Sequence, residues 1–131
     1  MFSIRTHNIL DYVAGIFLIA APYIFGFQDL RPAFQIFEFT GFILIAYSLL
    51  TRYPYSLAKL IPLGLHMIFD LAIGVVLISS PFIGGYFDNL TTVQKTVHIV
   101  SGVAALGLVA FTRMVSSKNK MWTASGMSKP V

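Results

Sequence analysis

The stretch HNILDYVAGIFLIAAPYIFG, residues 7–26, decides the fold, because residues 66–85 repeat its pattern as HMIFDLAIGVVLISSPFIGG. Histidine, aspartate, glycine, proline and glycine keep their spacing, and each residue of the second copy lies 59 positions after its counterpart (66 − 7 for the histidines). The matched residues are His7, Asp11, Gly15, Pro22 and Gly26 in the first copy, and His66, Asp70, Gly74, Pro81 and Gly85 in the second. An internal repeat defines the architecture before any local assignment. The sequence therefore predicts one structural unit built twice.

The matched positions share one side of a helix. At about 100° per residue, positions 7, 11, 15, 18, 22 and 26 fall within an arc of roughly 100°. The remaining positions of both copies are apolar but poorly matched, as expected of a surface that contacts lipid. The repeated stripe is therefore the predicted inward face.

The composition is that of an integral membrane protein. Of the 131 residues, 56% are hydrophobic and 11% are charged, whereas ordinary soluble domains have about 45–50% and about 25%. The absence of cysteine excludes disulfides, zinc–thiolate sites and a catalytic thiol. The basic residues do not gather on one folded face, so no nucleic-acid partner is expected. The expected partner is the lipid bilayer, with a homo-oligomer or another membrane protein as a further one, and no cofactor is expected.

Four apolar runs predict four transmembrane helices, at residues 9–27, 33–51, 62–83 and about 91–113. A run of about nineteen residues at about 1.5 Å each matches the hydrocarbon thickness. The predicted fold class is an all-α membrane protein with two parallel tandem helical-hairpin repeats. Repeat 1 covers about 4–55 and repeat 2 about 62–115, within a single transmembrane domain of residues 1–115. Residues 116–131 are the predicted polar tail.

Basic residues lie mostly on one side of the predicted spans. Arg5, Arg52, Lys59, Arg113, Lys118, Lys120 and Lys129 fall on the side of the termini, and Arg31 and Lys95 fall on the other. The positive-inside rule then predicts that both termini, and with them the tail, are cytoplasmic.

The chain resembles the SPW repeat family of small bacterial membrane proteins over about residues 4–115. Ala21-Pro22-Tyr23 and Ser80-Pro81-Phe82 stand where that family has Ser-Pro-Trp near the end of each first helix. The resemblance implies tandem two-helix repeats in a bacterial inner membrane and brings no established activity. DoxX-like four-helix membrane proteins are a more distant resemblance.

The two His/Asp pairs are the leading candidates for chemistry. Ionisable groups inside a span are costly and usually face the bundle interior, and an i, i+4 spacing lets each imidazole reach its own carboxylate. The favoured interpretation is ion-pair packing, with His7/Asp11 and His66/Asp70 tied to Arg52 and Arg113. The alternatives are proton or ion handling, and a metal site formed by the four His and Asp residues.

The other matched residues are predicted to be structural. Gly15 and Gly74 fit close packing of helices, and Gly26 and Gly85 fit turns. Pro22 and Pro81 lie near the far ends of their spans. Glu38 and His98 are expected to be solvated near the outer interface.

No catalytic constellation appears in the sequence, and the loops are too short to build a site outside the bilayer. The sequence therefore favours a structural, accessory or oligomeric membrane protein that is not an enzyme. Its alternatives are a small proton, ion or solute transporter, and a membrane metal or redox protein. A water-reachable cavity that touches Asp11 and Asp70 would favour transport, whereas carboxylates that only pack would be sealed against the arginines.

Overall fold

The computed structural model describes the backbone of residues 3–124 and the side chains of residues 3–112. This part of the chain forms four α-helices and one 3-10 turn, without a named strand: α1 (Ile4–Ile24), α2 (Arg31–Leu50), α3 (Leu63–Ile83), η1 (Phe87–Asn89) and α4 (Thr92–Ala124). Each α-helix is long and apolar enough to cross a membrane, α4 with its segment Thr92–Thr112. The chain is a multi-pass, all-α membrane protein.

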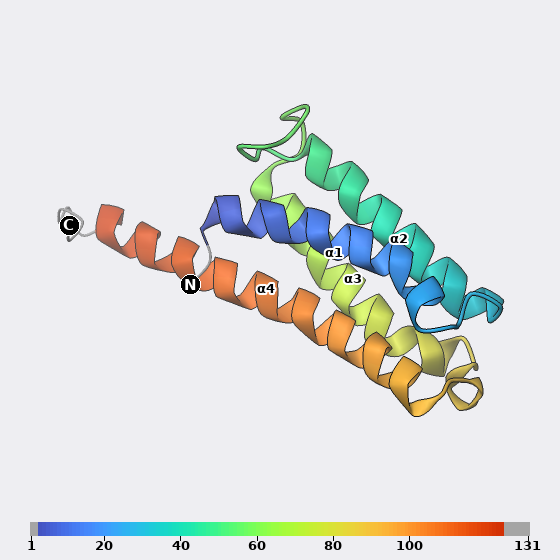
Figure 1. The fold of residues 1–131 in the computed structure, drawn as a ribbon. Helices are drawn as coiled ribbons and strands as arrows, with labels where there is room; N and C mark the ends of the chain where they lie inside the picture. Colours follow the sequence, from blue (N-terminus) through green and yellow to red (C-terminus); the bar gives the residue numbers. More distant parts are fainter. Residues whose placement is uncertain (1–2, 125–131) are drawn as a thin grey trace.

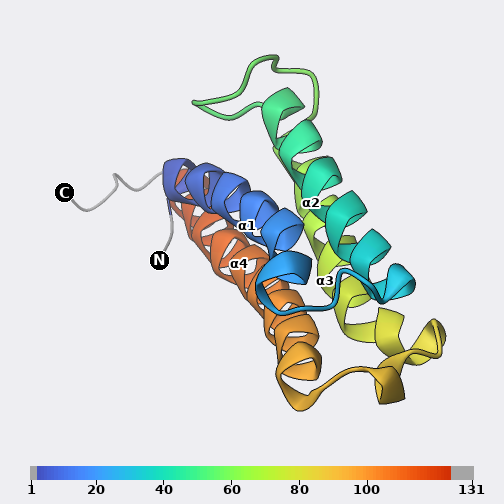
Figure 2. The ribbon, with the colours of Figure 1, turned by 45° about the vertical axis from the view of Figure 1, so that its right-hand side comes forward.

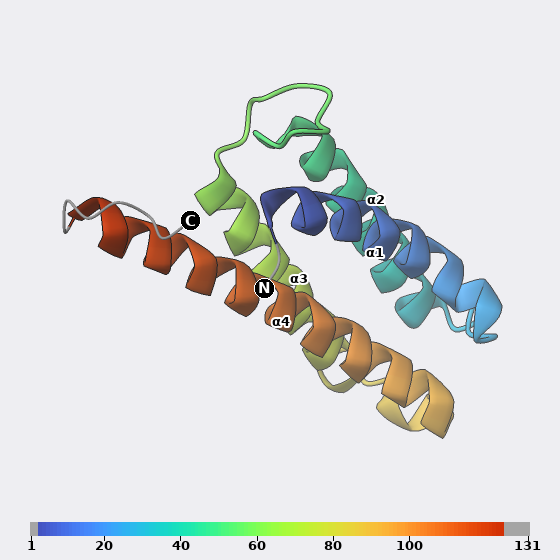
Figure 3. The same cartoon turned by 60° about the vertical axis from the view of Figure 1, so that its left-hand side comes forward.

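The helices run alternately up and down, so α1 and α3 point in the same direction (Figure 1). α1 packs mainly on α2, and α3 mainly on α4, while smaller interfaces join α2 to α3 and α1 to α4. Figure 2 shows α1 beside α4 and α2 beside α3. Figure 3 shows the pairs α1–α2 and α3–α4 as two hairpins. Two parallel repeats are expected to superpose, residues 7–53 on 66–114, by roughly half a turn about the membrane normal, and this stays a prediction.

A pair of glycines brings the two helices of each hairpin together. A Cβ atom on Gly41 would lie 2.8 Å from the carbonyl oxygen of Gly15, and one on Gly102 would lie 2.7 Å from that of Gly74. A backbone oxygen cannot move away as the tip of a side chain can. Small residues are therefore needed for this approach, as in other membrane helix pairs.

Both first helices of the hairpins end in the same way. Gly26 and Gly85 have φ values of 69° and 66°, where a side chain would be strained. The amide after Gly26 donates to the carbonyl of Pro22 at 2.9 Å, and the amide after Gly85 donates to that of Pro81 at 3.0 Å. This closing bond is that of a Schellman cap, and it lets a short connection turn the chain back.

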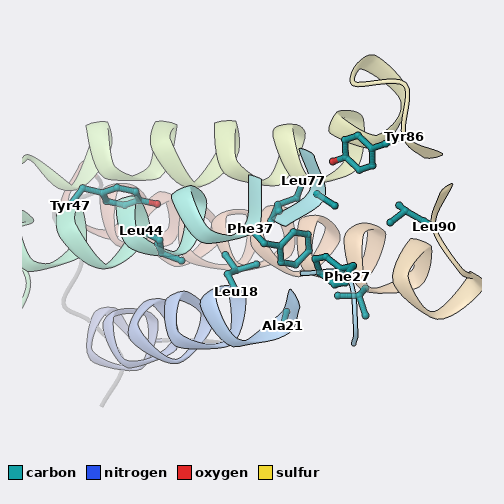
Figure 4. Packing of buried hydrophobic residues seen from close by; sticks show 11 residues of the cluster. Leu18, Ala21, Phe27, Phe37, Leu44, Tyr47, Leu77, Tyr86 and Leu90 are labelled. Atoms are coloured by element: carbon teal, nitrogen blue, oxygen red, sulfur yellow. The ribbon is translucent and has the colours of Figure 1, made fainter. Parts of the chain in front are cut away.

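Eleven of the buried apolar side chains form one cluster along the bundle axis. Figure 4 shows it running from Tyr47 at one end, past Leu18 and Leu77, to Tyr86 and Leu90 at the other. The Tyr47 end of this cluster adjoins the polar site described below, because the Tyr47 hydroxyl reaches Asp70.

Two helix ends differ from the sequence prediction. The last helix was expected to end near Arg113, but α4 continues to Ala124, so residues 116–124 of the predicted tail are helical. Residues 114–124 contain no proline or glycine, and their lysine, methionine and alanine residues favour a helix. The first helix begins at Ile4 rather than near Ile9, because the Ser3 side chain caps it.

Candidate functional site

His7 and Asp11 on α1 meet His66 and Asp70 on α3 in the half of the bundle nearer the start of both helices. All four side chains are buried, with exposed fractions of 0%, 1%, 0% and 4% in that order. His7 and Asp11 are one helical turn apart, as are His66 and Asp70, and both pairs face the interior of the bundle, so the four side chains converge on one point. The structure thus joins the two dyads of the repeat into one polar cluster, here called the His/Asp cluster.

Short distances link each imidazole to both carboxylates. His66 Nε2 lies 3.2 Å from Asp11 Oδ2 and 3.2 Å from Asp70 Oδ2. His7 Nε2 lies 3.2 Å from Asp70 Oδ2 and 3.5 Å from Asp11 Oδ1. The contacts between α1 and α3 are therefore as short as those within each helix.

Two threonines fix the orientation of the imidazoles. His66 Nδ1 is 2.8 Å from Thr51 Oγ1, and His7 Nδ1 is 2.8 Å from Thr112 Oγ1. Each threonine hydroxyl donates its only proton to a backbone carbonyl of its own helix, four residues earlier. The hydroxyl can then only accept from the histidine, so both Nδ1 atoms carry a proton.

The protonation of both Nδ1 atoms restricts what can lie between the Nε2 atoms and the carboxylate oxygens. With Nδ1 protonated, a neutral imidazole would turn a bare Nε2 lone pair toward carboxylate oxygens, which repel it. The cluster is stable only with shared protons or a cation among these atoms. The arrangement is chemically suited to holding protons or a metal ion inside the bilayer.

Two tyrosines complete the surroundings of the cluster. The Tyr47 hydroxyl donates to Asp70 Oδ1. The ring of Tyr53, which follows α2, lies 4.8 Å from that of His66 and 5.9 Å from that of His7, centroid to centroid. Burial raises the pKa of the Tyr53 phenol far above its usual range, and the negative charges of Asp11 and Asp70 raise it further. Tyr53 therefore stays neutral and covers the cluster from the side of the 51–62 loop.

A cavity of about 740 Å³ reaches the cluster from the other side. Its wall is mostly apolar, and Asp11 and Asp70 are both part of it. Buried side chains of α1, α2 and α3, such as Leu18, Leu44 and Leu77, form its floor, and half-exposed side chains of α1 and α4 surround its mouth. The cavity therefore opens between α1 and α4, where Figure 1 shows α3 passing behind them.

The two halves of the bundle differ at one position that explains this cavity. Gly41 and Gly102 are 61 residues apart, and the residue 61 positions after Tyr47 is Leu108 (108 − 47). Tyr47 fills the space beside Asp70 on the α2 side, whereas the shorter Leu108 lines the cavity on the α4 side. The interface of α1 and α4 thus stays open beside Asp11.

The structure does not bring Arg52 to the carboxylates. Arg52 is exposed in the 51–62 loop, and the ion pairs among residues with described side chains join the carboxylates to the two histidines. The predicted ion pair of Arg52 with the carboxylates is therefore wrong, because the loop leaves this side chain exposed. The side chain of Arg113 lies outside the described residues.

His98 corrects a second expectation, because it is fully buried rather than solvated. Its Nδ1 donates to the carbonyl of Gln94 at 3.0 Å, and its ring lies 4.6 Å from that of Phe37. Glu38 is half-buried and accepts a hydrogen bond from Tyr23 at 3.1 Å. His98 lies in the aromatic part of the core and is not part of the His/Asp cluster.

Sequence reasoning did not identify Thr51, Thr112, Tyr47 or Tyr53 as site residues. The signal for the threonines was present, since Thr51-Arg52 returns as Thr112-Arg113 at the offset of 61. A repeated hydroxyl on the helix that faces a repeated histidine indicates a hydrogen-bond partner. The tyrosines have no such repeat, because Leu108 takes the place of Tyr47.

The comparisons with known proteins identify the family. The model of the SPW repeat domain matches residues 5–112, which include both copies of the His-Asp-Gly pattern and all four helices up to Thr112. No curated protein and no solved structure matches the chain. The resemblance carried by Pro22 and Pro81 is thereby confirmed over most of the sequence, and the chain belongs to the SPW repeat family.

Proposed function

We propose that this protein binds a small amphipathic molecule dissolved in the bilayer, inside the cavity that ends at Asp11 and Asp70. The observation that carries the proposal is the contact between that cavity and both carboxylates. Ligand sites in proteins have volumes of about 300–1,000 Å³, apolar walls and few polar groups, and they occur between the helices of bundles. A purely structural ion pair needs no such cavity beside it. The proposed role is binding and includes no reaction.

The position of the mouth indicates how the ligand enters. Val13 on α1 and Val100 on α4 line the cavity and are 57% and 58% exposed, at a depth where the surroundings are lipid. An ion in water does not reach such an opening, whereas a molecule in the hydrocarbon layer does. The ligand therefore enters sideways, with an apolar body along the wall.

The inner end of the cavity selects the head group. The polar atoms there are carboxylate oxygens, which accept hydrogen bonds. A hydroxyl group meets this requirement without bringing a full charge into the bilayer, where a charge is costly. We therefore infer that the ligand is a hydroxyl-bearing, otherwise apolar molecule such as a long-chain alcohol.

Photolabelling of the purified protein tests this proposal. A long-chain alcohol with a photoreactive diazirine is expected to label residues that line the cavity, located by mass spectrometry. Gly107 lines the cavity, and a Cβ atom there would meet nothing within 4 Å. Gly107→Phe should therefore place its ring in the cavity and abolish the labelling.

Val103→Phe is the matched control, because Val103 is an exposed residue of the same helix outside the cavity lining. It should leave the labelling unchanged. Equal labelling by a diazirine alkane without the hydroxyl would show that ordinary lipid chains fill the cavity. That result, or labelling that survives Gly107→Phe, would refute the proposed function.

We also propose that both termini face the cytoplasm of a bacterial inner membrane. The support is the distribution of charge on the fold. Arg5, Arg52 and Lys59 lie at the end of the bundle where α1 begins, and Arg31 and Lys95 lie at the opposite end. Cytoplasmic loops carry the excess of basic residues. The expected homo-oligomer or protein partner stays a prediction.

A further inference from the structure

The His/Asp cluster has a set of atoms that face one another without forming hydrogen bonds. His66 Nε2 and Asp11 Oδ2 are 3.2 Å apart, yet neither has a hydrogen-bond partner among the residues with described side chains. Of the four short contacts between imidazoles and carboxylates, only that of His7 Nε2 with Asp70 Oδ2 has hydrogen-bond geometry. Ligand atoms that point at a common centre, rather than at each other, have this geometry.

The distances between imidazole nitrogens and carboxylate oxygens are close to those around a small cation. A tetrahedral zinc ion with bonds of about 2.0–2.1 Å has ligand atoms about 3.3–3.4 Å apart. Asp70 Oδ2 lies 3.2 Å from both Nε2 atoms. Asp11 lies 3.2 Å from His66 Nε2 through Oδ2 and 3.5 Å from His7 Nε2 through Oδ1. One ligand atom from each of the four residues lies within 4.8 Å of all the others.

We propose that His7, Asp11, His66 and Asp70 bind one divalent transition-metal ion of the zinc class, with two imidazole and two carboxylate ligands. Both histidines present Nε2 as a ligand, because Nδ1 of each donates to a threonine hydroxyl. Such outer contacts orient metal-binding histidines in general. Two carboxylates neutralise a divalent ion, so the site carries no net charge inside the bilayer. Imidazole and carboxylate ligands together suit ions of borderline character.

This inference concerns the same carboxylates as the proposed ligand site, but it does not depend on the ligand. The cavity lies on one side of the cluster, and the metal would lie between its four side chains. Gly107→Phe fills the cavity from α4 and leaves all four residues of the cluster in place. The metal content of that variant therefore separates the two proposals: it should stay at the wild-type level while photolabelling is lost.

The experiment uses the full chain in detergent, stripped of metal with a chelator and then equilibrated with Zn²⁺ or Co²⁺. Elemental analysis should find one tightly held zinc ion per chain, and Co²⁺ should give the intense visible absorption of four-coordinate cobalt. His66→Gln should lose both signals. His98→Gln is the matched control, since it changes another buried histidine outside the cluster, and it should keep both.

A gentler variant guards against loss of folding in His66→Gln. Thr51→Val keeps all four ligands and removes only the hydroxyl that orients His66, so it should weaken Co²⁺ affinity by about 10–100-fold. The proposal is overturned if the wild-type protein holds no zinc after equilibration. It is also overturned if Thr51→Val binds Co²⁺ as tightly as the wild type.

Discussion

Replacing Asp70 by asparagine removes one of the two negative charges from a buried cluster that also holds two imidazoles. Asp70 is 4% exposed, and its carboxylate lies 3.2 Å from both His7 Nε2 and His66 Nε2. In metal-free protein the two histidines would then share one carboxylate in a medium of low dielectric constant. Removing one partner of a buried ion pair costs about 3–5 kcal/mol, and we expect Asp70→Asn to lower the free energy of unfolding by that amount.

Asp11→Asn should be less damaging by about 1 kcal/mol. Asp70 also accepts a hydrogen bond from Tyr47. Such a bond contributes about 1.5–3 kcal/mol when the acceptor is charged and about 0.5–1.5 kcal/mol when both groups are neutral, so the asparagine retains only part of it. The comparison therefore measures the asymmetry that Tyr47 introduces between the two repeats.

Denaturation of chelator-treated protein in detergent, followed by circular dichroism, would measure both losses. Replacing His66 and Asp70 together by apolar residues is the control, because it leaves His7 paired with Asp11, whose atoms are 3.5 Å apart. This double variant should recover much of the stability lost in Asp70→Asn. Unchanged unfolding of both single variants would show that the carboxylates are not paired in a dry interior.

Three further outcomes follow from other parts of the fold. Gly102→Ala should destabilise the protein by about 1–3 kcal/mol through overpacking, because the new Cβ atom would lie 2.7 Å from a backbone oxygen. Gly107→Ala, in open space on the same helix, should instead gain up to about 1 kcal/mol from helix propensity. Equal melting temperatures of the two variants would contradict this. Burial raises the pKa of Tyr53 in the folded protein. The neutral phenol therefore stabilises the fold below the usual tyrosine pKa of about 10, and this stability is lost as the pH rises above about 10. The melting temperature of Tyr53→Phe should fall less steeply at alkaline pH than that of the wild type. Single cysteines at Asp29 and Lys59, both exposed and at opposite ends of the bundle, should react with an impermeant reagent from opposite sides of the membrane, and reaction of both from one side would refute the four-span fold.

The sequence by itself determined the four helices, the membrane and the identity of the central residues. A repeat of His, Asp and Gly at i, i+4 and i+8 is local information, because the 3.6-residue period of a helix places these residues on one face whatever surrounds it. The apolar length of each span likewise follows from the thickness of the bilayer. The family match over residues 5–112 bears out the resemblance carried by Ala21-Pro22-Tyr23 and Ser80-Pro81-Phe82.

Only the tertiary structure decided that the two dyads form one cluster, and what surrounds it. The distance from His66 to Asp11 depends on how α1 and α3 pack, which no spacing within one helix contains. Thr51 and Thr112 became partners of the histidines through that packing, whereas Arg52 was left exposed because the loop after α2 turns it away. The cavity depends on a difference of size between Tyr47 and Leu108, which matters only once each side chain stands beside its carboxylate. Helix periodicity follows from the local sequence, whereas the assembly of the His/Asp cluster depends on the contacts between helices.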